Sequence, residues 1–284
     1  MAKPVCLITG ATEGVGNATA QALARKGFTV VLAARSLAKA ENIKREIAAT
    51  SGAKDIDIIV GDLNSLRQVR QMAQTVLQRH PRLDLLINNA GIMAPERAVT
   101  EDGYESSYQV NYLSHFLLTH LLLDALKNSD QGRIINLSSS VYSIGKFDPG
   151  NLQSEQRFSA IGAYAASKLF VLMSTIELAE RLRGARTTVN AVHPGIVNTH
   201  MLKSATGIFK LIALLATPVA VSPEKGAATS VYLATSPDVA AVSGRYFTDG
   251  KSKPVKSKFN TEKNRALLWD ISMDALRLRE PARV

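Results

Sequence analysis

The 284-residue sequence contains one cysteine, Cys6, so no disulfide can form within the chain. This cysteine stands in an apolar run, which favours a buried thiol in a reducing compartment. No apolar run reaches the roughly 20 residues that span a bilayer, because Lys210 and Pro218 interrupt the longest one, 208–221. The first strand-like run starts so close to Met1 that a signal peptide has no room. These absences predict a soluble, cytoplasmic protein without a transmembrane anchor.

Acidic residues are the minority of the charged residues: 34 lysines and arginines stand against 24 aspartates and glutamates, for a net charge of +10. Such an excess invites a nucleic-acid interpretation. The basic residues are scattered, however, apart from segment 251–258, and aromatic side chains do not alternate with them. We interpret that segment as a solvated loop and predict no nucleic-acid partner, although an attraction for anionic ligands agrees with the charge.

Apolar runs alternate with helical patterns along most of the chain, and no repeat or flexible linker divides it, so we predict one domain over 1–284. Continuous apolar runs are typical of strands buried on both faces. The alternation predicts an α/β fold: a single Rossmann-type, doubly wound parallel sheet of about seven strands, order 3-2-1-4-5-6-7, with helices on both faces. The expected strands are 5–9, 29–34, 56–60, 83–88, 133–138, 188–192 and 244–247, and the expected helices are 15–26, 37–50, 65–80, 103–127, 160–183 and about 260–279.

A glycine-rich loop, TGATEGVG, follows the first strand and opens a helical pattern. Its spacing, G-x-x-x-G-x-G, differs from the commoner G-x-G-x-x-G, and three glycines alone could form an ordinary turn. The strand before it and the amphipathic helix after it favour a site where backbone N–H groups approach the pyrophosphate of a dinucleotide. The candidate residues in this loop are Gly10, Thr12, Glu13, Gly14, Val15 and Gly16.

The end of the second strand distinguishes NAD from NADP. Ala34 stands where an acid would bind the ribose 2′-hydroxyl, and Arg35 follows it. An arginine there favours a 2′-phosphate and hence NADP(H). Glu13 opposes this, because a carboxylate near a phosphate is unfavourable unless it points away. We predict NADP(H) without excluding NAD(H).

Polar and small residues follow the next two strands. Asp62, beside Leu63, could cap the following helix or accept a hydrogen bond from an adenine amino group. Asn89, Ala90 and Gly91 offer an amide and a close backbone approach where the cofactor should lie.

Tyrosine and lysine four residues apart can form an acid catalyst when they share a helix face. The sequence contains two such pairs, Tyr142 with Lys146 and Tyr164 with Lys168. The second pair opens a run of helix formers, whereas glycines and a proline surround the first, which we interpret as loop. A lysine ammonium and the positive nicotinamide ring would lower the pKa of the tyrosine from about 10. We expect chemistry only from Tyr164 and Lys168.

Several motifs stand in order along nearly the whole chain and together resemble the short-chain dehydrogenase/reductase family. They are TGATEGVG at 9–16, NNAG at 88–91, the asparagine in QVNYLSHF, NLSS at 136–139, YAASK at 164–168 and HPGIVNT at 193–199. The segments 191–199, 222–237 and 243–251, and the final RALLWDIS, resemble the retinol dehydrogenase-like branch of that family. Members of this branch generally use NADP(H).

The resemblance implies roles for four residues. Tyr164 is then the proton donor and acceptor, and Lys168 lowers the tyrosine pKa and binds the nicotinamide ribose. Ser139 hydrogen-bonds the substrate oxygen, because the serine of the family lies three residues beyond the asparagine of NLSS. Asn111 supports Lys168 through a bound water. Any of the three consecutive serines 138–140 could instead satisfy backbone groups at the strand end. The nicotinamide side is implied to be shaped by Pro194, Gly195, Val197 and Thr199.

The histidines carry no separate site. His115 and His120 stand in an apolar helical run without cysteine or carboxylate partners at ligand spacing, so we expect them to be packed, and no metal site is visible. For His193 we expect a role in loop structure.

The segment 199–221 lies where the family places its substrate lid. Its apolar content favours an apolar wall of the substrate pocket, an amphipathic patch that contacts a membrane, or a helix that covers the core. The expected function is an NADP(H)-dependent transfer of hydride between nicotinamide and the carbonyl or alcohol carbon of a lipophilic substrate. Two alternatives stay open: a non-catalytic NADP(H) sensor with a protein partner, and an epimerase or dehydratase of the same fold. The helix with Tyr164 is a candidate contact in a homo-oligomer.

Overall fold

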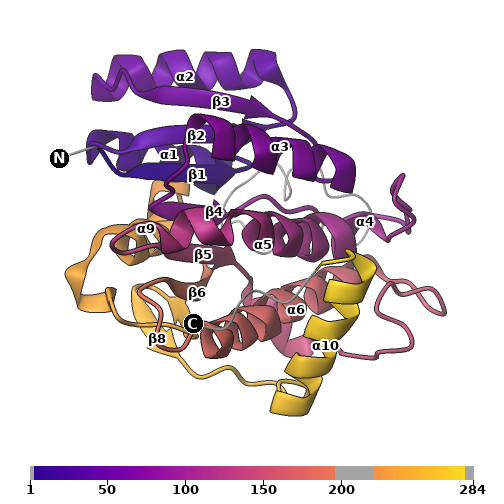
Figure 1. The fold of residues 1–284 in the computed structure, drawn as a ribbon. Helices are drawn as coiled ribbons and strands as arrows, with labels where there is room; N and C mark the ends of the chain where they lie inside the picture. The colour runs from indigo at the N-terminus through magenta and orange to yellow at the C-terminus, as the bar shows by residue number, and fades with distance from the viewer. Residues whose placement is uncertain (1–2, 196–220, 279–284) are drawn as a thin grey trace.

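The computed structural model describes residues 3–195 and 221–278 (Figure 1). These residues form one sheet of eight strands in the order β3-β2-β1-β4-β5-β6-β7-β8. Neighbouring strands from β3 to β7 are parallel, and β8 pairs with β7 in the antiparallel direction. The strands are β1 (Val5–Thr9), β2 (Thr29–Ala34), β3 (Ile56–Val60), β4 (Leu85–Asn88), β5 (Arg133–Leu137), β6 (Thr188–His193), β7 (Tyr246–Thr248) and β8 (Lys251–Lys253).

The predicted fold class and the strand order are confirmed through the seventh strand, but the predicted number of strands was one too few. Strand β8 lies inside the basic segment that was expected to be a solvated loop. All three of its residues are exposed, so no apolar pattern marks it and only backbone pairing with β7 defines it. Lysines on an edge strand also discourage pairing with another chain.

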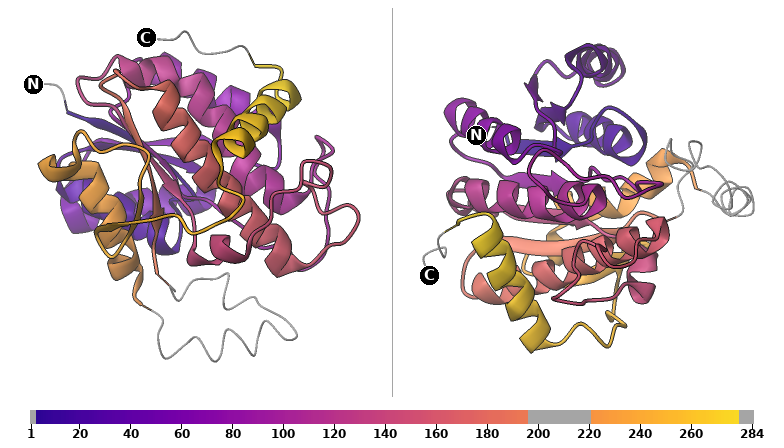
Figure 2. Two further views of the ribbon diagram at one scale, coloured as in Figure 1. Left: turned by 90° about the horizontal axis from the view of Figure 1, so that it is seen from below. Right: turned by 90° about the vertical axis from the view of Figure 1, so that its right-hand side faces the viewer.

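Helices cover both faces of the sheet, as the right-hand view of Figure 2 shows. Helices α1, α2 and α9 pack on one face, and α3, α5 and α6 pack on the other. Side chains alternate along a strand. Leu7 of β1 therefore packs on the face covered by α3, α5 and α6, whereas Cys6 and Ile8 pack on the face covered by α1, α2 and α9. Burial raises the pKa of the Cys6 thiol. The helices are α1 (Gly14–Arg25), α2 (Leu37–Ser51), α3 (Leu66–Arg79), α6 (Ala160–Arg181), α9 (Pro223–Thr235) and α10 (Glu262–Ala275), besides the interrupted helix described next.

The helix expected over 103–127 is interrupted. It consists of α4 (Ser106–Tyr108), the π-helical turn η1 (Gln109–Leu113) and α5 (Ser114–Lys127). The wider π turn carries Asn111, and such turns are frequent at functional sites. Asn111 makes its side-chain hydrogen bonds to residues far away in the sequence, so the local helical pattern could not reveal this interruption.

Helix α6 lies in the core and carries the second tyrosine–lysine pair. Among the described residues it is the helix long and apolar enough to cross a membrane, yet 67% of its most apolar window is buried within the fold. Helix α10 packs across it, with the Trp269 ring 4.7 Å from that of Phe116 in α5 and 4.5 Å from the Arg181 guanidinium of α6. The chain therefore covers part of the helix that the sequence offers as a subunit contact. A homo-oligomer and a cytoplasmic location stay predictions.

Candidate active site

The end of β1 and the start of α1 form the backbone cradle that the glycine spacing predicts. Gly10 and Gly14 adopt left-handed φ angles of 63° and 54°, which glycine reaches without strain. A Cβ at Gly16 would lie 2.3 Å from the carbonyl oxygen of Gly10 and 2.4 Å from Nδ2 of Asn89, so no side chain fits there. Helix α1 begins at Gly14 and presents its free N–H groups beside this loop. The cradle therefore fits the pyrophosphate of a dinucleotide.

The turn after β4 is tied to this cradle by the last residue of β1, Thr9. Its Oγ1 accepts hydrogen bonds from the backbone N–H groups of Asn89 at 2.9 Å and Ala90 at 3.1 Å. The Asn89 side chain in turn donates to the carbonyl oxygens of Thr9 and Gly10, at 2.8 and 3.1 Å. Sequence reasoning did not single out Thr9, although its place at a strand end beside the glycine loop was a usable signal.

Asn111 holds the backbone just beyond the same turn. Its Oδ1 accepts from the N–H of Ile92 at 2.7 Å, and its Nδ2 donates to the carbonyl oxygen of Ile92 at 2.8 Å and to Oγ of Ser167 at 2.9 Å. A Cβ at Gly91 would lie 3.2 Å from Nζ of Lys168 and 3.3 Å from Oδ1 of Asn111. Gly91 thus lets Asn111 and Lys168 approach the turn after β4 at one place.

Tyr164 and Lys168 lie one helical turn apart on α6, as their spacing predicts. Nζ of Lys168 is 5.6 Å from the centre of the Tyr164 ring and donates a 2.9 Å hydrogen bond to the carbonyl oxygen of Leu137, the last residue of β5. Only 3% of Lys168 is exposed. The pair therefore sits at the carboxyl end of the central strands.

Burial shifts the pKa values of both members of this pair in the cofactor-free chain. Burial raises the pKa of the Tyr164 hydroxyl to about 12, although a hydrogen bond with Ser139 opposes the change. Burial lowers the pKa of Lys168 to about 8. The predicted lowering of the tyrosine pKa includes the positive nicotinamide ring and stays a prediction for the cofactor-bound protein; in the chain by itself, desolvation of the phenolate is the largest effect. Further positive charge has to come from a bound cofactor.

Of the three consecutive serines, Ser139 is the one beside the tyrosine. It interacts with the Tyr164 hydroxyl and opposes the rise in the tyrosine pKa. Ser138 points elsewhere and donates a 2.9 Å hydrogen bond to the carbonyl oxygen of Lys168, and Ser140 is exposed. Ser139 also caps the short helix after β5 by accepting from the N–H of Val141 at 3.5 Å. The backbone role that the sequence left open for Ser139 is therefore present together with the contact to Tyr164.

The first tyrosine–lysine pair does not converge. Tyr142 is buried, with its ring 5.2 Å from that of Tyr246 and its hydroxyl accepting a 3.0 Å hydrogen bond from the N–H of Lys256. Lys146 is exposed. The segment expected to be loop contains a 3-10 helix, η2 (Ser140–Ile144), but this helix ends before Lys146.

Charged residues gather where β2 ends. Arg35 is exposed and has no ion-pair partner within the part of the chain that the structure describes. The Ser36 hydroxyl caps α2 by accepting from the N–H of Lys39 at 3.3 Å, and Nζ of Lys39 lies 3.3 Å from the Glu13 carboxylate. Glu13 is therefore neutralised by a lysine that the sequence analysis did not select.

The end of β3 carries Asp62, whose Oδ1 accepts from the backbone and side-chain N–H groups of Asn64, at 2.9 and 3.1 Å. Ser65, not Asp62, caps α3. Asp62 thus shapes the turn, and capping of the helix was the wrong alternative. Leu63 is buried, and its carbonyl oxygen accepts from Ser114 at 2.6 Å.

The end of β6 carries residues that the resemblance assigns to the nicotinamide side. Pro194 and Gly195 follow the strand, and Gly195 has a φ of 84°. Burial lowers the pKa of His193, whose Nδ1 is buried without a hydrogen-bond partner among the described residues. Val197, Thr199 and nearly all of the expected lid 199–221 lie outside the described residues.

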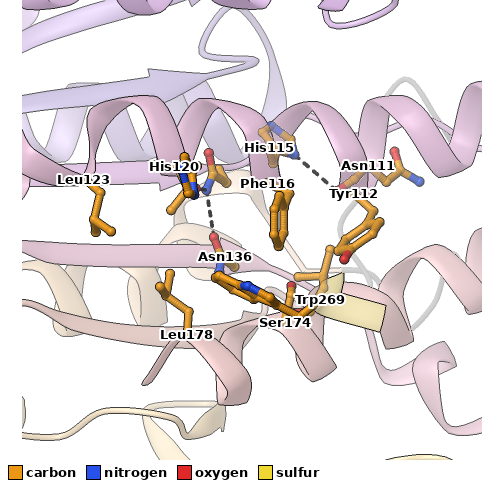
Figure 3. A pocket seen from close by; sticks show the side chains of 13 residues that line it. Asn111, Tyr112, His115, Phe116, His120, Leu123, Asn136, Ser174, Leu178 and Trp269 are labelled. Carbon is orange, nitrogen blue, oxygen red and sulfur yellow. Dashed lines mark hydrogen bonds between the residues drawn. The ribbon is translucent and has the colours of Figure 1, made fainter. Parts of the chain in front are cut away.

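A crevice lies behind these residues, between α5, α6 and α10 (Figure 3). It holds about 30 Å³ of water-accessible volume, room for roughly two water molecules. Phe116 extends into it toward Trp269. Asn136 accepts a 2.8 Å hydrogen bond from Asn88, whose own Oδ1 has no partner among the residues that the structure describes. Within the residues that the structure describes, no group of histidine, cysteine and carboxylate side chains could hold a metal ion.

Comparisons with known proteins agree with this geometry. The family model for the short chain dehydrogenases matches residues 4–207. The chain is 44% identical to retinol dehydrogenase 14 of Mus musculus, over 94% of this chain and 84% of that protein. It is 38% identical to retinol dehydrogenase 12 of Homo sapiens, over 97% of this chain and 87% of that protein.

Solved structures are similar as well. An uncharacterized protein from Mycobacterium paratuberculosis is 33% identical, with a TM-score of 0.78 and coverage of 99% of this chain and 96% of that one. A short chain dehydrogenase from Salmonella enterica is 25% identical, with a TM-score of 0.69 and coverage of 88% and 96%. The chain therefore belongs to the short-chain dehydrogenase family of nicotinamide-dependent oxidoreductases and is retinol dehydrogenase-like.

Proposed function

We propose that this protein is an NADP(H)-dependent oxidoreductase that transfers hydride between nicotinamide and the carbonyl or alcohol carbon of a lipophilic substrate. One observation carries the proposal. Ser139 lies beside Tyr164 and opposes the rise in its pKa, and the buried ammonium of Lys168 lies beside the tyrosine ring and the Gly91 backbone. Two hydroxyls that converge next to a dinucleotide cradle suit a substrate oxygen that must gain or lose a proton.

The residues divide the reduction of a carbonyl between them. Bound NADPH would supply the hydride. Ser139 donates a hydrogen bond to the substrate oxygen, which stabilises the negative charge that develops there. Tyr164 then gives its hydroxyl proton to the same oxygen. Lys168 stabilises the phenolate that is left and offers its remaining N–H donors to a ribose hydroxyl.

Lys168 is suited to this work because its charge is adjustable. With a pKa lowered to about 8, it is protonated at neutral pH but close to its titration point. Its contact with the carbonyl oxygen of Leu137 holds the amine in place in both protonation states. In oxidation the roles reverse, and Tyr164 accepts the proton of the alcohol.

The NADP(H) preference rests on the charges after β2. Arg35 is exposed and unpaired among the described residues, and Lys39 lies one helical turn into α2. These two charges support an interaction with a 2′-phosphate, to which Ser36 would add a hydroxyl. The pairing of Glu13 with Lys39 answers the objection that Glu13 would repel the phosphate.

Binding measurements test this preference. Removal of a charge-assisted hydrogen bond costs roughly 1.5–3 kcal/mol, so Arg35→Ala should weaken NADPH binding about tenfold to a hundredfold. NADH, which lacks the 2′-phosphate, should bind both proteins equally. Glu13→Gln should tighten NADPH by releasing Lys39. Equal losses for both cofactors in Arg35→Ala would contradict the assignment.

A substrate panel tests the function itself. NADPH oxidation would be followed with retinaldehyde, aliphatic aldehydes of increasing length, ketones and quinones. The proposal expects kcat/KM to rise with the length of the apolar chain. Tight NADPH binding without turnover of any substrate would instead favour the non-catalytic sensor, and isomerised product without net NADPH oxidation would favour an epimerase.

A further inference from the structure

His115 is buried, and both of its ring nitrogens make polar contacts. It lies on α5, one turn after Asn111, and only 5% of it is exposed. Its Nε2 lies 2.9 Å from Oγ1 of Thr9, and its Nδ1 lies 3.2 Å from the backbone carbonyl oxygen of Asn111. Figure 3 shows the second contact as a dashed line at the end of the crevice. The imidazole therefore bridges the end of β1 and the π turn.

The bonds of Thr9 determine which ring nitrogen carries the proton. A threonine hydroxyl accepts two hydrogen bonds and donates one. Both acceptor positions of Thr9 are taken by the N–H groups of Asn89 and Ala90. Its proton can go to Nε2 at 2.9 Å or to the carbonyl oxygen of Ile87 at 3.5 Å, and the shorter contact is the real hydrogen bond. Nε2 is then unprotonated, so Nδ1 carries the hydrogen and donates it to Asn111.

These bonds close a ring. Thr9 holds the N–H groups of Asn89 and Ala90, and the chain continues through Gly91 to Ile92. The Asn111 side chain is hydrogen-bonded to both the N–H and the carbonyl oxygen of Ile92. The backbone carbonyl oxygen of Asn111 is in turn hydrogen-bonded to His115. The ring of hydrogen bonds passes through Gly91, where an added Cβ would lie 3.2 Å from Nζ of Lys168.

We propose that His115 is a positioning residue: as the neutral Nδ1–H tautomer, it closes the ring of hydrogen bonds that fixes the turn after β4 and Asn111 against Lys168. This inference deepens the proposed oxidoreductase function and rests on it. The protonation state is favoured independently, because burial, reinforced by the charge of Lys168, lowers the pKa of His115 to about 4. A protonated imidazole would turn an Nε2–H donor toward the Thr9 hydroxyl, whose two acceptor positions are already occupied, and the ring of hydrogen bonds would break.

The expected effect of opening the ring is kinetic. A misplacement of about 1 Å can cost a hundredfold in rate, so His115→Leu should lower kcat about tenfold to a hundredfold at saturating NADPH. His115→Gln, whose amide oxygen can accept from Thr9 near the position of Nε2, should recover part of this loss. His120→Leu is the matched control, since His120 lies on the same helix and lines the same crevice; its kcat should stay within about threefold of the wild type.

A double-mutant cycle separates positioning from packing. If His115 acts through the Thr9 hydroxyl, His115→Leu should cost several-fold less kcat in a Thr9→Val background than in the wild type, because the shared bond is already lost. The same cost in both backgrounds would overturn the inference. Thermal melts show whether each variant is folded at the assay temperature, so that a lower kcat cannot be caused by unfolded enzyme.

Nitrogen NMR of the imidazole provides a test that needs no turnover. Protein labelled with ¹⁵N-histidine should show one neutral ring whose Nδ1 carries the proton at pH 7, and this signal should be absent in His115→Leu. An Nε2–H tautomer would overturn the inference even in an active enzyme. Absence of turnover in the wild type with the expected tautomer present would instead remove the proposed function, so the two failures are distinguishable.

Discussion

The buried Lys168 should destabilise the cofactor-free protein at neutral pH. Burial lowers its pKa from 10.5 to about 8. At pH values between these two, the unfolded chain binds the proton and the folded chain does not, so stability rises with pH across this window. Below pH 8 the full penalty is present. A shift of this size corresponds to roughly 3 kcal/mol of unfolding free energy at pH 7 and about 1 kcal/mol at pH 9.5.

The substitution Lys168→Met isolates this penalty. Methionine keeps the apolar stem but cannot titrate. It loses the hydrogen bond to Leu137, which both forms of the lysine donate, so that loss should be nearly independent of pH. Urea unfolding of both proteins without cofactor, at pH 7 and pH 9.5, gives the difference in unfolding free energy at each pH. Between these pH values the wild type should gain about 2 kcal/mol relative to the variant.

Lys146→Met is the matched control, because Lys146 belongs to the unused tyrosine–lysine pair and is exposed. Its difference from the wild type should be the same at both pH values. If the difference for Lys168→Met is also independent of pH, or changes in the opposite sense, the lysine is not held in a desolvated site and the argument for its adjustable charge fails.

Two further substitutions test the cradle and the serines. Gly16→Ala places a Cβ 2.3 Å from the Gly10 carbonyl oxygen. In binding and urea assays this substitution should weaken NADPH binding at least about tenfold and lower stability by about 1–3 kcal/mol. Gly150→Ala, where the nearest atom is 3.6 Å away, should change neither quantity. Ser139→Ala should lower kcat by about 10²–10³, the usual cost of losing a donor to a developing oxyanion. Ser138→Ala should mainly cost about 1 kcal/mol of stability, and the reverse pattern would exchange their roles.

Much of this architecture can be predicted from the sequence where local pattern and tertiary demand agree. Strands β1, β2 and β3 have their predicted bounds, because glycine or polar residues on either side of each short apolar run mark where the strand begins and ends. The pairing of Tyr164 with Lys168 follows from helical spacing alone. Strand β8 could not be predicted, since Lys-Ser-Lys has no buried face and only its backbone pairs.

Other features depend on residues that the sequence keeps far apart. The π turn at Asn111 is tied to Ile92 and Ser167, and the bridge from His115 ends at Thr9, which precedes it by more than a hundred residues. The pKa of Tyr164 depends on how completely packing removes water, which no four-residue motif encodes. The spacing of a motif identifies its participants, but its electrostatics appear only in the packed structure.

The tyrosine pair offers the most direct test of the account. NADPH oxidation with the best substrate would be measured for Tyr164→Phe and Tyr142→Phe, together with NADPH affinity. General acid catalysis contributes about 10²–10⁴ in rate, so Tyr164→Phe should lose that much kcat and still bind NADPH. Tyr142→Phe, which loses only the contact with the N–H of Lys256, should keep its kcat. Full turnover by Tyr164→Phe, or its loss in Tyr142→Phe, would contradict the central claim.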